Sequence, residues 1–285
     1  MTKQIKRSQI NAVIRYAILL FIGFILIYPI LWMVGGAFKD NADIFGNFNI
    51  LPPLDNIVLE HFPSAWQLSG NNTILFYYAN TLRFLIPRVL FTIISCTITA
   101  YAIARFNFRF KKVVFTVVIV TLLMPEVAFR IPVFVIMRDL RLLNTFTALW
   151  IQDAFAVNSF FVFMIIQFMR TIPRELDEAA SIDGCNALQT LWHILVPVLK
   201  PILISVGLLT FMWGMNDFLG PLIYLTGAEN RPLSLALAVL LDPTELVQIG
   251  RVLAAATLGL LPTIAIFFAC SRYFVQSVTS SGGKE

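Results

Sequence analysis

The sequence predicts an all-α, polytopic membrane protein with six transmembrane helices, both termini in the cytoplasm and a short cytoplasmic helix between spans four and five. Of its 285 residues, 58% are hydrophobic and only 13% are charged, whereas an average soluble domain carries about 25% charged residues. In addition, charge-free runs of transmembrane length recur along the chain. One globular core could not hide this much apolar surface, which argues against a soluble enzyme, a disordered chain or a nucleic-acid-binding protein.

The spans were located from runs that lack Asp, Glu, Lys and Arg. A helix that crosses about 30 Å of hydrocarbon needs about 20 mostly apolar residues, because its backbone hydrogen bonds must be satisfied internally. The third span is the weakest, since Pro125, Glu126, Arg130 and Pro132 interrupt it. If this span is left out, however, the basic loops that follow it no longer fall on the same side of the membrane as the basic loops before it. Within one transmembrane domain, 1–285, the predicted spans are 16–38, 82–104, 113–137, 149–169, 194–216 and 252–275.

The distribution of basic residues predicts the orientation. Lys and Arg concentrate in cytoplasmic loops, and Arg105, Arg109, Lys111 and Lys112 form a cluster that contains no acidic residue. Placing this loop inside the cell puts both termini there as well. The basic N-terminus resembles that of a secretory signal, but the uncharged run 16–38 exceeds the usual apolar region of about 7 to 15 residues. We therefore expect a retained first helix.

Two long connections are predicted on the outer side. Residues 39–75 are polar and contain several prolines, and 217–251 contain the apolar stretch Pro232–Leu241. This stretch is too short to cross a bilayer. It is predicted to form a re-entrant helix, a helix lying on the surface, or a loop that packs on another protein.

The inner connection between spans four and five, 170–193, carries the most informative pattern. Pro173 suits the first turn of a helix, and Glu175, Asp177 and Glu178 crowd that turn, where the positive end of the helix dipole favours acidic residues. Gly184 allows the positive φ at which such a helix can stop. The pattern predicts a short acidic helix that ends in a glycine turn and is tied directly to two transmembrane helices.

This region resembles a known family. Glu178-Ala179-Ala180, then Gly184, then Ile194-Leu195-Val196-Pro197 are spaced as in the inner-membrane permeases of binding-protein-dependent ABC importers, except that Val196 replaces the usual Leu. The resemblance is to the carbohydrate-importing, MalG-like branch, and it covers most of the chain. Further similar segments are Tyr28-Pro29, Asn80-Thr81-Leu82, Ala100–Phe106, Leu142–Thr145, Trp213–Phe218 and Arg272–Val275.

The resemblance implies a permease subunit of the bacterial inner membrane that pairs with a second, homologous permease subunit, two ATP-binding subunits and an extracytoplasmic solute-binding protein. It also implies that the acidic helix is a coupling helix seated in the ATPase. The sequence contains no Gly-x4-Gly-Lys-Ser/Thr loop, so ATP and Mg²⁺ are expected on the partner, with no cofactor and no enzymatic activity in this chain. The coupling residues implied are Glu175, Glu178, Ala179, Ala180, Asp183 and Gly184.

Five further residues are candidates for the solute pathway. Glu126 and Arg130 are four residues apart and can meet on one helix face, either at the pathway or as a structural pair. Trp213, Asn216 and Asp217 end span five, where an aromatic ring and polar groups suit a sugar, although Trp is also a common interface anchor. No catalytic or metal site is predicted: His61 and His193 are isolated, and the Cys residues are scattered.

The alternative class is a self-sufficient ion-coupled carrier or an intramembrane enzyme. Either would require His, Asp or Glu residues clustered inside the spans. From the sequence, only Glu126 and Arg130 come near this requirement, and the other five spans are expected to hold essentially no buried acid. Sugars of different length, polyols and glycerophosphate-like compounds all remain open as the solute.

Overall fold

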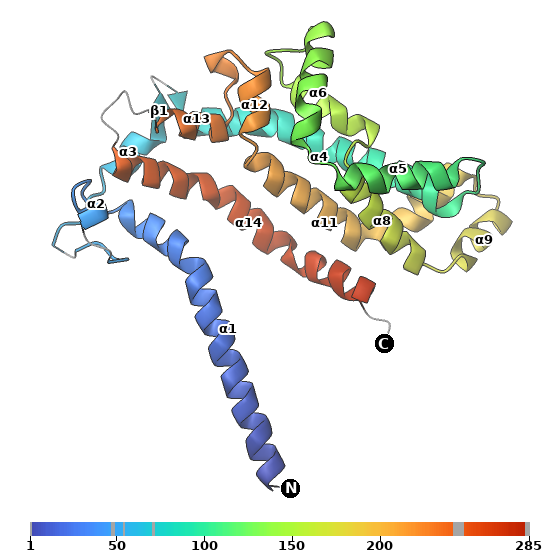
Figure 1. Ribbon diagram of the computed structural model, residues 1–285, viewed down its shortest axis with the longest axis horizontal. Coiled ribbons are helices and arrows are strands. Elements are labelled where there is room, and N and C mark those ends of the chain that lie inside the picture. The colour runs from blue at the N-terminus through green and yellow to red at the C-terminus, as the bar shows by residue number, and fades with distance from the viewer. Residues whose placement is uncertain (1, 47–48, 54, 70–71, 242–247, 283–285) are drawn as a thin grey trace. The chain divides into compact units, whose positions relative to one another are not determined.

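The computed structural model describes residues 2–46, 49–53, 55–69, 72–241 and 248–282, which are mostly helical (Figure 1). Two compact units divide the chain, one made of 1–74 and 237–260 and the other of 75–236 and 261–285. The helices in chain order are α1 Thr2–Gly36, α2 Asp43–Gly46, α3 His61–Trp66, α4 Ile74–Arg105, α5 Lys111–Leu123, α6 Val127–Asp139, α7 Thr147–Trp150, η1 Ile151–Phe155, α8 Ser159–Thr171, α9 Glu175–Ile182, α10 Ala187–Gln189, η2 Thr190–Leu195, α11 Val196–Met215, α12 Leu219–Tyr224, η3 Ala228–Asn230, α13 Leu233–Val239 and α14 Ile249–Gly282. A small antiparallel pair joins strands β1 Gln67–Ser69 and β2 Asn72–Thr73.

Among the described residues, five helical segments are long and apolar enough to cross a bilayer, or six if one bent pair counts as a span. The bent pair is α5 and α6, whose axes meet at 107°. The predicted third span, 113–137, is therefore not one straight rod. Its break follows from Pro125, because a residue before proline avoids the helical region and Met124 is extended, with φ −82° and ψ 138°. The five segments are 11–36, 74–105, 147–171, 187–215 and 249–273. Segment 147–171 is interrupted between η1 and α8, where Ala156 has a φ of +53°.

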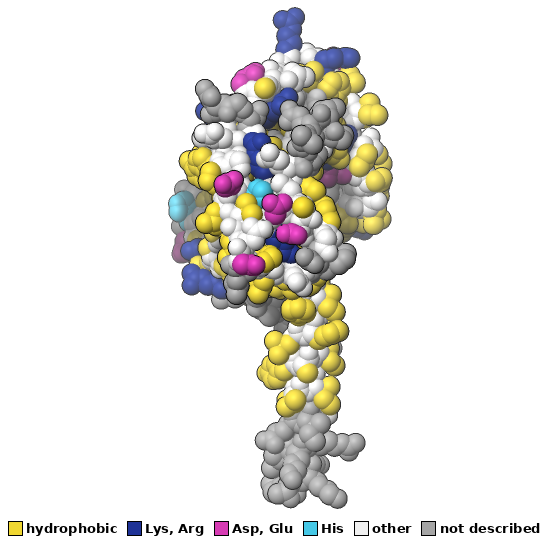
Figure 2. Space-filling view, turned by 90° about the vertical axis from the view of Figure 1, so that its left-hand side faces the viewer, with side chains coloured by type: hydrophobic (Ala, Val, Ile, Leu, Met, Phe, Trp, Pro, Cys, Tyr) yellow, Lys and Arg dark blue, Asp and Glu magenta, His cyan; other side chains and the backbone are white. Residues whose placement is uncertain are grey.

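In the first unit, α1 exposes hydrophobic side chains on every side. Val13 is 68% exposed, Leu20 74% and Leu26 72%, and Figure 2 shows apolar side chains along the described part of this helix. A helix that is apolar all round belongs in lipid or against another protein.

The connection after α1 is held by polar contacts to backbone atoms. Lys39 is buried and its Nζ donates to the carbonyl of Asn49, while His61 Nε2 lies 3.0 Å from the Lys39 carbonyl oxygen. At the start of α14, Arg251 donates to the carbonyls of Ser64, Gln67 and Leu68. These contacts tie the connection between α1 and α4 to backbone carbonyl groups.

The second unit is built around α4. One core cluster joins α4 to α8, η2 and α11 and includes the buried Cys96, Phe161, Ile165 and Leu195. A second cluster lies toward the Ile74 end of α4 and includes Phe84, Leu85, Met137, Leu149 and Tyr224. The short apolar stretch Pro232–Leu241 contains the seven-residue helix α13, as its length suggested.

Candidate functional site

The predicted acidic helix is present as α9, with Glu175, Asp177 and Glu178 in its first turn. It ends at Ile182, and Gly184 adopts φ +81°. Two backbone hydrogen bonds close the turn, from Gly184 N to the Ser181 carbonyl at 3.1 Å and from Cys185 N to the Ala180 carbonyl at 2.9 Å. The left-handed conformation expected from the glycine is therefore the one observed.

One side of α9 packs on the unit and the rest is exposed. Ala180 is only 1% exposed, and its small side chain allows α9 to lie close to η2, which it contacts. Leu176 is 39% exposed and Ile182 87%. The other predicted coupling residues, Glu175, Glu178, Ala179, Asp183 and Gly184, are all exposed as well. The helix thus presents two exposed apolar side chains among acidic ones.

Arg105, the last residue of α4, attaches α9 to that helix. Its Nε lies 3.2 Å from Oδ2 of Asp177, and its Nη2 donates to the Ile172 carbonyl at 3.1 Å. The Arg105 side chain is 9% exposed and that of Asp177 23%. Nε and Oδ2 are close but not aligned as a hydrogen bond, so the pair is held by charge and by the contact to Ile172. Beside it lies a pocket of about 250 Å³ that is also lined by Tyr101, Arg174 and Glu178.

On its other side α9 leads into the helix that contains α11. Asn186 and Gln189 form a reciprocal capping box, with side-chain to backbone distances of 2.9 Å and 2.8 Å. The helix then widens into the π-helical turn η2 before α11. Pro197 explains the irregular turn, because proline supplies no N–H and its ring clashes with a carbonyl four residues earlier. The helix begins at Ala187, earlier than the boundary at 194 expected from apolar composition.

The structure places Glu126 and Arg130 together, as their spacing suggested. Arg130 Nη2 lies 3.1 Å from Glu126 Oε1, with Glu126 82% exposed and Arg130 22% exposed. In the described part of the chain, no hydrogen bond or ion pair joins this pair to Trp213, Asn216 or Asp217. The geometry matches a structural pair at the break between α5 and α6.

Trp213, Asn216 and Asp217 are neighbours in sequence but make different contacts. The Trp213 ring stacks on Phe161, with centroids 5.1 Å apart and planes at 24°, yet its side chain stays 49% exposed. Asn216 Nδ2 donates to the Met212 carbonyl at 2.8 Å. Asp217 instead pairs with Arg88, with 3.0 Å between Oδ2 and Nη1. Only Trp213 and Asn216 therefore offer exposed groups to a solute.

The sequence pattern did not predict a role for Arg88, nor the charge network that this residue forms inside the second unit. Its Nε also lies 3.5 Å from Oδ2 of Asp153, so one guanidinium faces two carboxylates. Asp153 is 13% exposed and falls within the predicted span 149–169. The expectation that the spans hold essentially no buried acid was therefore wrong. The sequence signal was a basic residue and an acidic residue each placed directly before a long charge-free run, Val89–Ala104 and Ala154–Met169.

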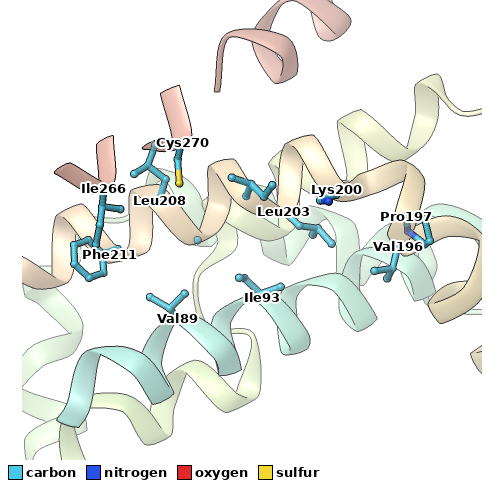
Figure 3. A pocket seen from close by; sticks show the side chains of 12 residues that line it. Val89, Ile93, Val196, Pro197, Lys200, Leu203, Leu208, Phe211, Ile266 and Cys270 are labelled. Carbon is cyan, nitrogen blue, oxygen red and sulfur yellow. The ribbon is translucent and has the colours of Figure 1, made fainter. Parts of the chain in front are cut away.

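An apolar groove of about 450 Å³ runs between α4, α11 and α14 (Figure 3). Val89 and Ile93 of α4 point toward α11, and Ile266 and Cys270 come from α14. Lys200 is the one charged residue among those that line it. The groove offers a solute smooth apolar walls and few hydrogen-bonding groups.

Within the described residues, no group of three or more His, Cys, Asp or Glu side chains could hold a metal ion. His61 contacts the Lys39 carbonyl, and His193 Nδ1 lies 3.2 Å from the Gln189 carbonyl oxygen. Both histidines are therefore engaged with backbone oxygens.

The chain is similar to known transport proteins over most of its length. The chain is 31% identical over 275 residues to the probable ABC transporter permease protein YurM of Bacillus subtilis, covering 94% of this chain and 87% of that protein. It is 26% identical over 276 residues to the lactose transport system permease protein LacG of Rhizobium radiobacter, covering 96% and 97%. A solved bacterial ABC transporter involved in the import of the acidic polysaccharide alginate has the same fold, with a TM-score of 0.80, 23% identity, and coverage of 93% and 97%. Residues 94–280 match the family described as the binding-protein-dependent transport system inner membrane component. This chain belongs to that family of inner-membrane transport components.

Proposed function

We propose that this chain is the permease subunit of an ATP-driven importer for a carbohydrate-type solute, forming half of the translocation pathway. The names of similar proteins support a sugar as the solute class. In this proposal the second half of the pathway is a homologous permease, two ATP-binding subunits carry ATP and Mg²⁺, and a solute-binding protein delivers the sugar from outside.

The proposed topology places both termini and α9 in the cytoplasm. The basic cluster at Arg105, Arg109, Lys111 and Lys112 supports it, because such clusters stay on the inner side. The Arg105 end of α4 and α9 are joined by an ion pair, so both must lie on the same side. The bent pair α5 and α6 would then approach the outer side without forming a straight span.

The observation that carries the proposal is the attachment of α9. A helix that exposes Leu176 and Ile182 to a partner is fixed to α4 through Arg105 and leads through the capping box into α11. Closure of a partner seated on α9 would therefore move both transmembrane helices. To change a gate from about 1:99 to 99:1, the ATP-bound partner must favour one state by roughly 5.5 kcal/mol. A short helix that ends in a fixed glycine turn can transmit such a bias better than a mobile loop.

In the solute pathway, this chain would provide an apolar wall rather than a binding site. The groove between α4, α11 and α14 is apolar, so a sugar passing along it would not be held tightly. The exposed Trp213 ring and the Asn216 side chain remain candidate contacts near the end of α11. Glu126, Arg130 and Asp217 are engaged in ion pairs, which makes them weaker candidates for solute binding.

If the chain were instead an ion-coupled carrier, Asp153 and Asp217 of the Arg88 network would be the acidic residues available to bind the ion. A proton or cation relay needs carboxylates that can change their charge, whereas Asp153 and Asp217 share the permanent charge of Arg88. The match to a family of binding-protein-dependent transport components favours the ATP-driven class.

The test is purification of the chain with its genomic neighbours and reconstitution in vesicles. We expect co-purification with an ATPase and uptake of at least one labelled probe among lactose, arabinotriose and N,N′-diacetylchitobiose only when ATP and the binding protein are present. Uptake by this chain alone, driven by an ion gradient, would refute the proposal.

A further inference from the structure

The Arg88 side chain joins three segments that are far apart in the sequence. It belongs to α4, and it faces Asp153 of η1 and Asp217, which follows α11. The side chains of Arg88, Asp153 and Asp217 are 23%, 13% and 17% exposed. Charges removed from water in this way are costly unless they are paired, so their pairing constrains where the three segments can lie.

The acidic residues are themselves held in place. Thr92 Oγ1 donates to Asp153 Oδ1 at 3.3 Å, and Ser95 Oγ donates to the Asp153 carbonyl at 2.6 Å. Asp217 Oδ1 accepts from Gly220 N at 3.0 Å, and Ser234 Oγ donates to the Asp217 carbonyl at 2.7 Å. Thr92 and Ser95 lie on the same helix as Arg88, so α4 contacts Asp153 three times. The network therefore has polar partners on each side of the guanidinium.

Its position on α4 relates it to the coupling helix. Arg88 precedes Arg105 by 17 residues along one helix, which corresponds to roughly 26 Å at 1.5 Å per residue. That distance is close to the thickness of the hydrocarbon core, about 30 Å. One arginine thus anchors α9 to one end of α4, and the other anchors η1 and the end of α11 at a site nearly a membrane thickness away.

We propose that Arg88 is a positioning residue of the transport cycle. By pairing with Asp153 and Asp217 it makes α4, η1 and the end of α11 move as one body, so that displacement of α9 reaches the far side of the pathway. This inference rests on the proposed importer function and adds a residue that the coupling motif does not contain. Arginine suits the role because its planar, forked guanidinium can face two carboxylates, whereas the single ammonium group of lysine acts as a point charge.

The experiment compares Arg88→Met, Arg88→Lys and wild type in vesicles that contain the complete importer. ATP hydrolysis and uptake of the transported probe from the panel above are measured together, giving the number of sugars imported per ATP. For Arg88→Met we expect ATP hydrolysis within twofold of wild type and uptake reduced at least tenfold. Arg88→Lys should recover part of the uptake.

The matched control is Arg83→Met, which removes an exposed arginine of the same helix. Arg83 donates to Asn80 and lies outside the network. Its ratio of sugar to ATP should stay within twofold of wild type. The double variant Asp153→Asn, Asp217→Asn should instead lower the ratio of sugar to ATP, as Arg88→Met does. An unchanged ratio in this double variant would show that the network is unimportant.

Two outcomes would overturn the inference. Unchanged coupling in Arg88→Met would show that the network does not transmit movement. A parallel loss of hydrolysis, uptake and membrane abundance in both Arg88 variants would assign Arg88 to folding alone. If wild type itself shows no ATP-driven uptake, it is the proposed function that fails, so the two failures can be told apart.

Discussion

Arg105 and Asp177 form an ion pair across 3.2 Å, between the last residue of a 32-residue helix and the first turn of α9. The pair is mostly shielded from water, and the Arg105 guanidinium also holds the Ile172 carbonyl at 3.1 Å. Two separate contacts from one side chain therefore hold the first turn of α9 against the end of α4. The pair joins two helices that are far apart in the chain, since α5, α6, α7, η1 and α8 lie between them.

Replacing Arg105 by Met should separate ATP hydrolysis from uptake. Methionine preserves much of the stem but removes the charge, leaving Asp177 partly buried and the Ile172 carbonyl without its donor, at a cost of about 1 to 3 kcal/mol. We expect at least a tenfold fall in sugar imported per ATP, together with a lower thermal midpoint of the purified complex.

Arg109→Met is the control for Arg105. Arg109 is exposed and its guanidinium lies over the Phe110 ring at 5.7 Å. Loss of coupling in both variants would point to general positive charge at this loop and would contradict a specific role for the Arg105 pair.

Gly184→Ala should weaken binding of the ATPase without a steric clash. A Cβ at this position meets nothing within 4 Å, but φ of +81° is unfavourable for an L-residue by about 1 to 2 kcal/mol. The turn that presents α9 would lose population, and a loss of about 1 kcal/mol corresponds to roughly fivefold weaker binding. Titration of the detergent-solubilised permease with the ATPase measures this change.

Gly184→Asn is the matched variant, because asparagine tolerates the left-handed conformation better than alanine does. Its affinity should lie between those of wild type and Gly184→Ala. Equal affinities for all three would mean that the glycine turn is not needed to present α9.

Ile182→Asp should weaken the same complex while leaving the fold intact. Ile182 is 87% exposed, so the substitution removes no internal packing. If its side chain is buried by the partner, the loss is about 1.5 to 3 kcal/mol, or roughly 10-fold to 150-fold in affinity. Phe45→Asp, at a 61% exposed position on α2, should leave ATPase affinity unchanged, and an equal effect of both substitutions would rule out a specific docking surface.

The sequence predicted local features better than long-range pairing. The acidic first turn of α9 and the positive φ at Gly184 follow from the dipole of a helix and from the conformational freedom of glycine, and both are observed. Asp153 was overlooked because it adjoins the charge-free run used to locate a span, and its pairing with Arg88 depends on tertiary packing. Likewise, Pro125 signalled a break, but the 107° angle between α5 and α6 cannot be derived from a local pattern.

The close approach of α4 to α11 at Gly214 predicts a strong effect of substituting this residue. A Cβ there would lie 2.2 Å from Leu85 Cδ1, and Leu85 is fully buried, which leaves it little room to move. Overpacking of this kind costs about 1 to 3 kcal/mol, so Gly214→Ala should lower the thermal midpoint of the purified protein.

The cause can be tested with Leu85→Ala, which removes the atom that the new Cβ would meet. Alone, this change leaves a cavity and is itself destabilising, by about 2 to 5 kcal/mol. Combined with Gly214→Ala, the total loss should be smaller than the sum of the two single losses, because the residues are in contact. Gly23→Ala on α1 is the control: its Cβ meets nothing within 4 Å, so the thermal midpoint should stay the same or rise, as expected from helix propensity. Strictly additive losses at Gly214 and Leu85 would show that the close approach of α4 and α11 is not what makes glycine necessary.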